Sequence, residues 1–144
     1  MISIKTHGIV DYSFGAAYLI APYLFGFSDL YFAHDVFTIM GFAMIGYSLL
    51  TDYRGSLKRA VPLGMHLSFD VASGVFVVLA PWIYGYHELL SPLQSALHWI
   101  MGMGTISLVA FTHHDAGPGT AVLTPEAESL QAIEAEQRQR KEAA

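Results

Sequence analysis

Residues 7–27 read HGIVDYSFGAAYLIAPYLFGF and residues 66–86 read HLSFDVASGVFVVLAPWIYGY. At a shift of 59 residues, both stretches follow one pattern, H-x3-D-x3-G-x5-A-P-[YW]-[LI]-[FY]-G-[FY]. The segments that come after them match more loosely at a shift of 61, which pairs residues 39–41 with residues 100–102 and Thr51 with Thr112. Agreement at so many positions, several of them rare in apolar helices, predicts that one two-helix unit has been duplicated.

The chain is too apolar for a soluble domain. Of its 144 residues, 53% are hydrophobic and 13% are charged, about half the usual charged share of a soluble protein. A bilayer core requires about 20 apolar residues per helix. Four segments meet this requirement: Lys5–Phe27, Leu30–Thr51, Val61–Tyr86 and Leu93–Thr112. The sequence therefore predicts an all-α fold, a four-transmembrane-helix bundle of two tandem parallel-repeat hairpins.

The membrane domain is expected to cover residues 1–115, with repeat one at about 3–53 and repeat two at about 62–114. Because each unit crosses the membrane twice, both copies enter it in the same direction. A pseudo-twofold axis along the membrane normal should then relate the two copies. The lipid bilayer is the expected partner, and small residues on the helix faces would also permit a homo-oligomer.

Lysine and arginine predict the orientation. All seven fall in three places, namely Lys5, residues 54–59 and residues 138–141. The two other loops, at residues 28–33 and 87–92, contain none. Four spans place the three basic segments on one side of the membrane. We therefore expect a multi-pass protein of the inner (plasma) membrane with both termini in the cytoplasm.

Residues 116–144 differ in character from the rest of the chain. A Gly117-Pro118-Gly119 break precedes a polar segment, and Thr124-Pro125-Glu126 resembles a helix start. We expect a cytoplasmic polar tail that is partly helical and solvated. A helix that docks on a cytoplasmic partner is the alternative.

The recurring A-P-[YW] segment resembles the SPW repeat, a family of small prokaryotic integral membrane proteins named for a Ser-Pro-Trp motif at this place. The resemblance covers about Ile4 to His113. Ala21 and Ala80 stand where the motif has serine, and Tyr23 replaces tryptophan in the first copy, whereas Trp82 keeps it. The resemblance implies two tandem two-helix repeats and no particular activity.

One histidine and one aspartate recur in each copy of the repeat: His7 and Asp11, then His66 and Asp70. A spacing of four places both side chains on the same helix face. Ionisable groups at membrane depth face the bundle interior or a water-filled cavity. If the equivalent faces of the first and third spans meet on the axis, these four residues form one cluster, with Gly15 and Gly74 allowing the two helices to approach.

Three interpretations of this cluster remain open. The favoured one is structural, since two imidazoles and two carboxylates satisfy one another and fix the helix register. The second is a divalent metal site for Zn²⁺, Fe²⁺ or Mn²⁺, with haem held by His7 and His66 as a lesser variant. In the metal interpretation, Asp52, His113, His114 and Asp115 would be further ligands or an entry funnel. The third is proton or ion passage through the bundle.

Several other chemistries are excluded or unsupported. The chain has no cysteine, so it has no disulfide, thiolate metal site or thiol nucleophile. It has no phosphate-binding loop, no nucleophile motif and no basic stripe for nucleic acid. His98, Met101 and Met103 are expected to be packing residues. We expect a non-enzymatic protein.

Overall fold

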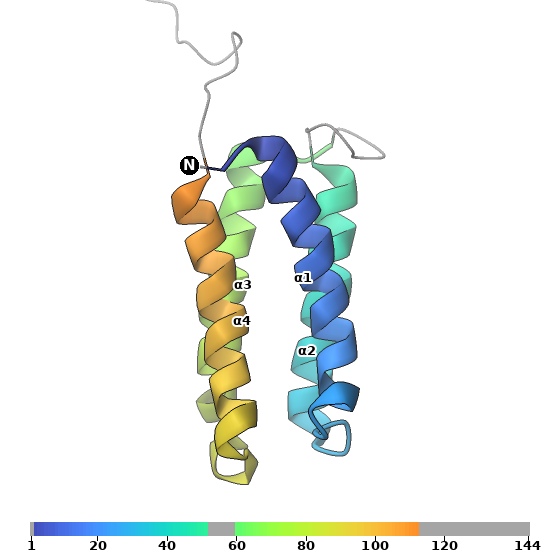
Figure 1. Ribbon diagram of the computed structural model, residues 1–144, viewed down its shortest axis with the longest axis vertical. Helices are drawn as coiled ribbons and strands as arrows, with labels where there is room; N and C mark the ends of the chain where they lie inside the picture. Colours follow the sequence, from blue (N-terminus) through green and yellow to red (C-terminus); the bar gives the residue numbers. More distant parts are fainter. Residues whose placement is uncertain (1, 52–59, 113–144) are drawn as a thin grey trace, which may run out of the picture. The chain divides into compact units, whose positions relative to one another are not determined.

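The computed structural model describes residues 2–51 and 60–112, which form four α-helices arranged as two hairpins (Figure 1). Helices α1 (Ile4–Leu24) and α2 (Tyr31–Leu50) make the first hairpin; α3 (Leu63–Ile83) and α4 (Pro92–Phe111) make the second. A single 3₁₀ turn, η1 (His87–Leu89), lies in the second hairpin loop. The predicted all-α fold of two hairpins is confirmed. The tail at 116–144 lies outside the described residues.

Local sequence explains where the helices begin. The Ser3 side chain accepts a hydrogen bond from the Thr6 backbone N–H and caps α1. At the start of α4, Ser91 and Gln94 form a reciprocal capping box, and Pro92 occupies the first helical turn, where its missing N–H costs nothing.

The A-P-x-x-x-G part of the repeat is a helix-stop signal. Gly26 and Gly85 have φ of 67° and 71°, the left-handed conformation that glycine adopts without strain. The N–H of Phe27 donates to the carbonyl of Pro22 at 2.8 Å, as in a Schellman motif, and Tyr86 repeats this contact with Pro81. Helices α1 and α3 therefore end three residues before the predicted Phe27 and Tyr86.

Paired glycines set the packing inside each hairpin. A Cβ on Gly102 would lie 2.5 Å from the Gly74 carbonyl oxygen, and a Cβ on Gly41 would lie 2.9 Å from the Gly15 carbonyl oxygen. The expectation that Gly15 and Gly74 bring α1 and α3 together was wrong. Each glycine instead faces the other helix of its own hairpin, where backbones approach most closely.

Backbone contacts join the ends of the two hairpins. The backbone of Ile2 pairs with that of Thr112, and Val61 pairs with Thr51. The Ile2 N–H donates to the Phe111 carbonyl at 2.7 Å, and the Val61 N–H donates to the Leu50 carbonyl at 2.9 Å. Since these pairs are equivalent under the shifts of 59 and 61, the start of each repeat is tied to the end of the other. We call this end of the bundle the site end, and the opposite end, with Gly26 and Gly85, the turn end.

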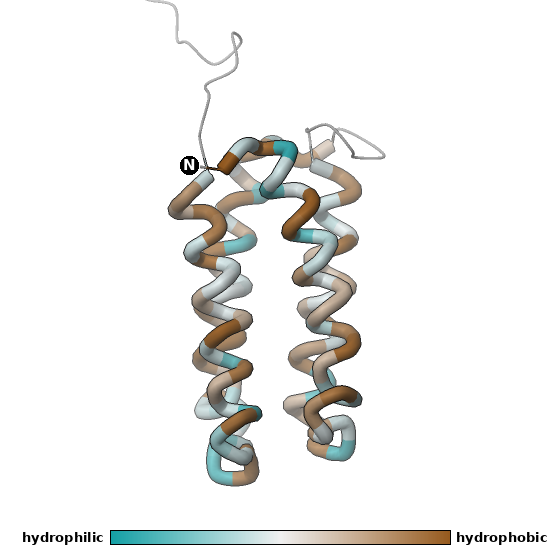
Figure 2. Tube along the Cα trace, in the orientation of Figure 1, coloured by the Kyte–Doolittle hydropathy of each residue, from teal (hydrophilic) through white to brown (hydrophobic). Residues whose placement is uncertain are grey.

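Apolar side chains fill the interior and also cover much of the exterior. Aromatic and aliphatic residues such as Tyr18, Phe37, Val77 and Met101 are buried between the helices. Figure 2 shows hydrophobic positions along the length of both hairpins. Among the described residues, α2 and α3 are long and apolar enough to cross a membrane. That length and composition suggest a membrane protein only weakly, and orientation stays a prediction.

We predict that Gly102→Ala destabilises the protein by about 1–3 kcal/mol, because the new methyl group overlaps the Gly74 backbone. The matched control is Gly46→Ala, since nothing lies within 4 Å of a Cβ at Gly46. Thermal unfolding of detergent-purified variants measures the difference. Equal melting temperatures for the two variants would contradict this description of the hairpin contact.

Candidate metal centre

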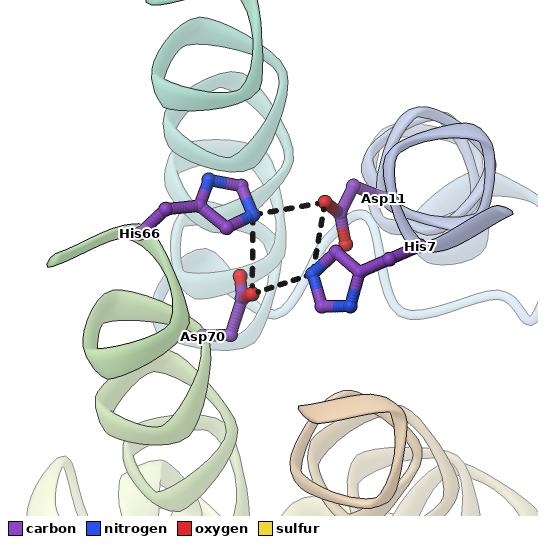
Figure 3. A group of neighbouring side chains, drawn as sticks. All are labelled: His7, Asp11, His66 and Asp70. Carbon is purple, nitrogen blue, oxygen red and sulfur yellow. Dashed lines mark hydrogen bonds and ion pairs between the residues drawn. The ribbon is translucent and has the colours of Figure 1, made fainter. Parts of the chain in front are cut away.

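The four repeated polar residues meet at the site end between α1 and α3 (Figure 3). His7 Nε2 lies 3.3 Å from Asp11 Oδ2 and 3.1 Å from Asp70 Oδ2. His66 Nε2 lies 3.0 Å from Asp11 Oδ2 and 3.2 Å from Asp70 Oδ2. All four side chains are at most 1% exposed. The four atoms thus form a closed ring of non-covalent contacts in which nitrogen and oxygen alternate. Helices α1 and α3 each supply one nitrogen and one oxygen.

Helical spacing explains this arrangement. His7 is the fourth residue of α1 and His66 the fourth of α3, and the aspartates follow one turn further along the same faces. Each imidazole therefore contacts the aspartate of its own helix and also reaches the aspartate of the other. The predicted convergence of the two faces is observed.

Two threonines fix the orientation and the tautomer of the imidazoles. Thr51 Oγ1 donates to the Tyr47 carbonyl at 2.7 Å and lies 2.8 Å from His66 Nδ1. Thr112 Oγ1 donates to the Leu108 carbonyl at 2.6 Å and lies 2.7 Å from His7 Nδ1. A hydroxyl that has given its proton to a carbonyl can only accept from the ring, so both Nδ1 atoms carry hydrogen.

The consequence is that both Nε2 atoms turn towards the carboxylates. In a neutral imidazole with hydrogen on Nδ1, Nε2 presents a lone pair. Two nitrogen lone pairs and two carboxylate oxygens then point at one another, which is unfavourable unless a proton or a cation lies between them. Protons on the imidazoles or the carboxylates, or a metal cation, meet this requirement.

The donor set fits a metal ion. One ligand atom from each residue can be chosen so that all four lie within 4.8 Å of one another. Neighbouring ligands about 2.0 Å from a metal ion lie about 3.3 Å apart at tetrahedral positions, and the four nitrogen–oxygen contacts of 3.0–3.3 Å are of that size. Metal-bound histidines also commonly donate their other N–H to a protein oxygen, the role that the two threonines have here.

The outer oxygens of the two aspartates differ. The Tyr47 hydroxyl donates a short hydrogen bond to Asp70 Oδ1. Asp11 Oδ1 is buried and has no hydrogen-bond partner among the described residues. Buried carboxylate oxygens are normally paired. This oxygen therefore still has the capacity to accept a hydrogen bond or to bind a cation.

Sequence reasoning found the four central residues but missed those around them. Thr51 and Thr112 occupy equivalent positions in the two repeats, and this recurrence could have indicated their role. Tyr47 has no tyrosine counterpart in the second repeat, so nothing in the sequence indicated its role. The further ligands considered from sequence, Asp52, His113, His114 and Asp115, lie outside the described residues.

At the turn end, His98 is a packing residue, as predicted. Its Nδ1 lies 2.8 Å from the Gln94 carbonyl and its Nε2 lies 3.2 Å from the Tyr86 hydroxyl. The ring packs against Phe27 and Phe37. With both ring nitrogens engaged, His98 offers no free donor for a metal.

Two copies of one helical hairpin, joined by a buried centre to which each contributes a histidine and an aspartate, define a duplicated-hairpin protein. The chain belongs to the SPW repeat family: the model of the SPW repeat domain matches residues 5–112. No curated protein and no solved structure matches it significantly. The family accounts for the repeat, and the role of the centre must be inferred from its geometry.

We predict that Thr51→Val and Thr112→Val each destabilise the protein by about 1–3 kcal/mol, because each removes a buried acceptor from an imidazole N–H. Ser68→Ala is the control, since its exposed hydroxyl bonds only the Gly64 carbonyl of its own helix in the described contacts. Chemical unfolding in detergent measures all three. If the two threonine variants are as stable as Ser68→Ala, the threonines do not hold the imidazoles.

Proposed function

We propose that this SPW repeat protein is a four-span integral membrane protein that binds one divalent metal ion through His7, Asp11, His66 and Asp70. The observation that carries the proposal is the convergence of two imidazole Nε2 atoms and two carboxylate oxygens, with both Nδ1 atoms engaged by threonines. Zn²⁺, Fe²⁺ and Mn²⁺ suit this mixed nitrogen and oxygen set.

The outer surface supports insertion in a membrane. Each of the four helices exposes large apolar side chains, among them Ile20 at 57%, Phe42 at 65%, Ile83 at 60% and Ile100 at 64%. Soluble monomers rarely expose apolar surface so extensively. Lipid would cover these side chains, while the charged groups of the core stay in the interior.

Charge and sequence together favour a centre on the cytoplasmic side. Lys5 lies at the site end, and the basic residues at 54–59 belong to the loop between α2 and α3, whose adjoining helix ends also lie there. The turn end has Asp29 and Glu88 in its loops and no lysine or arginine. The positive-inside rule places the site end in the cytoplasmic leaflet.

A metal ion at the centre would interact favourably with more of the nitrogen and oxygen atoms than protons would. Each Nε2 lies within 3.3 Å of two carboxylate oxygens, but a single proton points well at only one of them. A cation at the centre attracts all four atoms at once. Two aspartates also neutralise a divalent ion, and a neutral complex is the least costly kind to bury in an apolar bundle.

The haem variant is not supported. Haem held by two histidines needs the space between the imidazoles for the porphyrin. Here the carboxylate oxygens of Asp11 and Asp70 occupy that space, within 3.3 Å of both Nε2 atoms.

A structural brace is the second candidate. The two contacts between helices, His7 with Asp70 and His66 with Asp11, are hydrogen bonds, and the two within helices are at ion-pair distance. Two protons on the imidazoles would therefore also pair the groups and leave the cluster neutral. The brace and the metal centre use the same residues, and metal content separates them.

We predict that the purified full-length protein retains about one equivalent of a divalent metal, because the centre provides one set of four ligands. His7→Ala and His66→Ala should lose it, whereas the control variants His34→Ala and His87→Ala should keep it, since their rings lie in the half-exposed turn-end region. Elemental analysis after gel filtration measures the content. Metal-free wild type that also fails to bind added Zn²⁺, Fe²⁺ or Mn²⁺ would leave the brace as the function of the cluster.

We predict a topology with the site end inside the cell. Because the chain lacks cysteine, single-cysteine variants report position directly. Asp29→Cys and Glu88→Cys, in exposed turn-end loops, should react with a membrane-impermeant maleimide in intact cells, and Lys5→Cys should react only after lysis. Labelling of Lys5→Cys in intact cells would reverse the proposed orientation.

A further inference from the structure

We infer that the metal centre is asymmetric and five-coordinate, with Asp70 binding through one oxygen and Asp11 through both. This inference rests on the proposed metal site. The difference between Tyr47 and Leu108 sets the coordination number. It also favours an ion that accepts an additional oxygen ligand, Fe²⁺ or Mn²⁺, more than a strictly symmetric four-ligand site would.

The ring and its threonines are equivalent in the two halves of the centre, but Tyr47 breaks this equivalence. The shift of 59 relates His7 to His66 and Asp11 to Asp70, and the shift of 61 relates Thr51 to Thr112. The same shift of 61 relates Tyr47 on α2 to Leu108 on α4. Tyrosine carries a hydroxyl donor and leucine carries none.

That difference determines what each carboxylate can do. The Tyr47 hydroxyl donates to Asp70 Oδ1, which leaves Oδ2 as the oxygen facing the imidazoles. At the equivalent place Leu108 offers no donor, and Asp11 Oδ1 has no hydrogen-bond partner in the described part of the chain, although Asp11 is 0% exposed.

Coordination by both oxygens satisfies the unpaired atom. A buried carboxylate oxygen without a partner is costly, and a metal ion close to its sister oxygen is the nearest source of positive charge. Aspartate binds cations through either one or two oxygens. Asp70 has less need and less freedom to do so, because its Oδ1 is already satisfied and oriented by the hydrogen bond from Tyr47.

The resulting ligand count is five: two imidazole nitrogens, one oxygen of Asp70 and two of Asp11. Structural Zn²⁺ sites are almost always four-coordinate, whereas oxygen-rich sites of higher coordination number suit Mn²⁺. Tyr47 is therefore a positioning residue for Asp70, and the absence of its counterpart at Leu108 shapes the preference for the ion.

The test is the visible spectrum of the full-length protein loaded with Co²⁺ in detergent, for wild type, Tyr47→Phe and Leu108→Tyr. Co²⁺ absorbs strongly when four-coordinate and progressively more weakly when five- or six-coordinate. The wild-type protein should absorb with an intensity between those of four-coordinate and six-coordinate Co²⁺. Leu108→Tyr should place a hydroxyl on Asp11 Oδ1 and increase the absorption. Tyr47→Phe removes only a hydroxyl, frees Asp70 and should decrease it.

Competition between Zn²⁺ and Mn²⁺ gives a second measurement. The ratio of Zn²⁺ to Mn²⁺ affinity should rise by about tenfold in Leu108→Tyr, the lower range of effects for groups that support metal ligands. Intense four-coordinate absorption in wild type, or an unchanged spectrum in Tyr47→Phe, would overturn the asymmetric centre. Failure to bind Co²⁺, or binding that survives His66→Ala, would instead overturn the proposed metal site itself.

Discussion

The closed ring of contacts among His7, Asp11, His66 and Asp70 is the constraint on which the rest of the structure depends. Four groups that can carry charge are buried in a bundle whose other interior residues are mostly apolar, and none could stay there unpaired. Because each imidazole contacts the aspartates of both helices, α1 and α3 have only one relative register that satisfies all four. Substitution of any one of the four residues would leave a buried polar group without its partner. The free-energy cost of that unpaired group is far larger than the net contribution of the ring to folding.

Packing and polar contacts hold different parts of the molecule together. Within each hairpin, paired glycines let the backbones approach until a Cβ would touch the opposite carbonyl, so dispersion and close fit hold the two helices together. Between the hairpins, the joining contacts at the site end are polar: the ring, the threonine–imidazole pairs and the exchanged backbone pairs. Apolar side chains can pack in many arrangements, so their contacts specify little, whereas buried polar groups have few places where they are satisfied. The polar contacts at the site end therefore add a specific alignment to two hairpins that also share an apolar core.

The sequence predicted the parts of this arrangement that periodicity encodes. Two copies of one pattern indicated two hairpins, and histidine and aspartate four residues apart indicated one shared face. It failed where the outcome depends on three-dimensional neighbours. Gly15 and Gly74 could face either of two helices, and spacing along one helix does not say which. Gly26 and Gly85 were identified as repeated residues, but their left-handed conformation, which ends the helices early, depends on hydrogen bonds to Pro22 and Pro81 that the pattern does not display. Tyr47 lies on a helix that matches its repeat only loosely, so its bond to Asp70 became visible only in the structure.

Duplication explains both the symmetry of the centre and the value of departing from it. A pseudo-twofold axis gives two identical sets of one imidazole, one carboxylate and one threonine, the simplest way to assemble four converging polar groups from a short repeat. Perfect symmetry would also hold both carboxylates in the same manner. After duplication the two copies are free to diverge, and the pair Tyr47 and Leu108 shows such divergence next to the ring. One aspartate is anchored by a hydroxyl and the other keeps an unpaired oxygen. The repeat therefore supplies the symmetric framework of the cluster, and the substitution of one position on α2 and α4 gives its two carboxylates different surroundings.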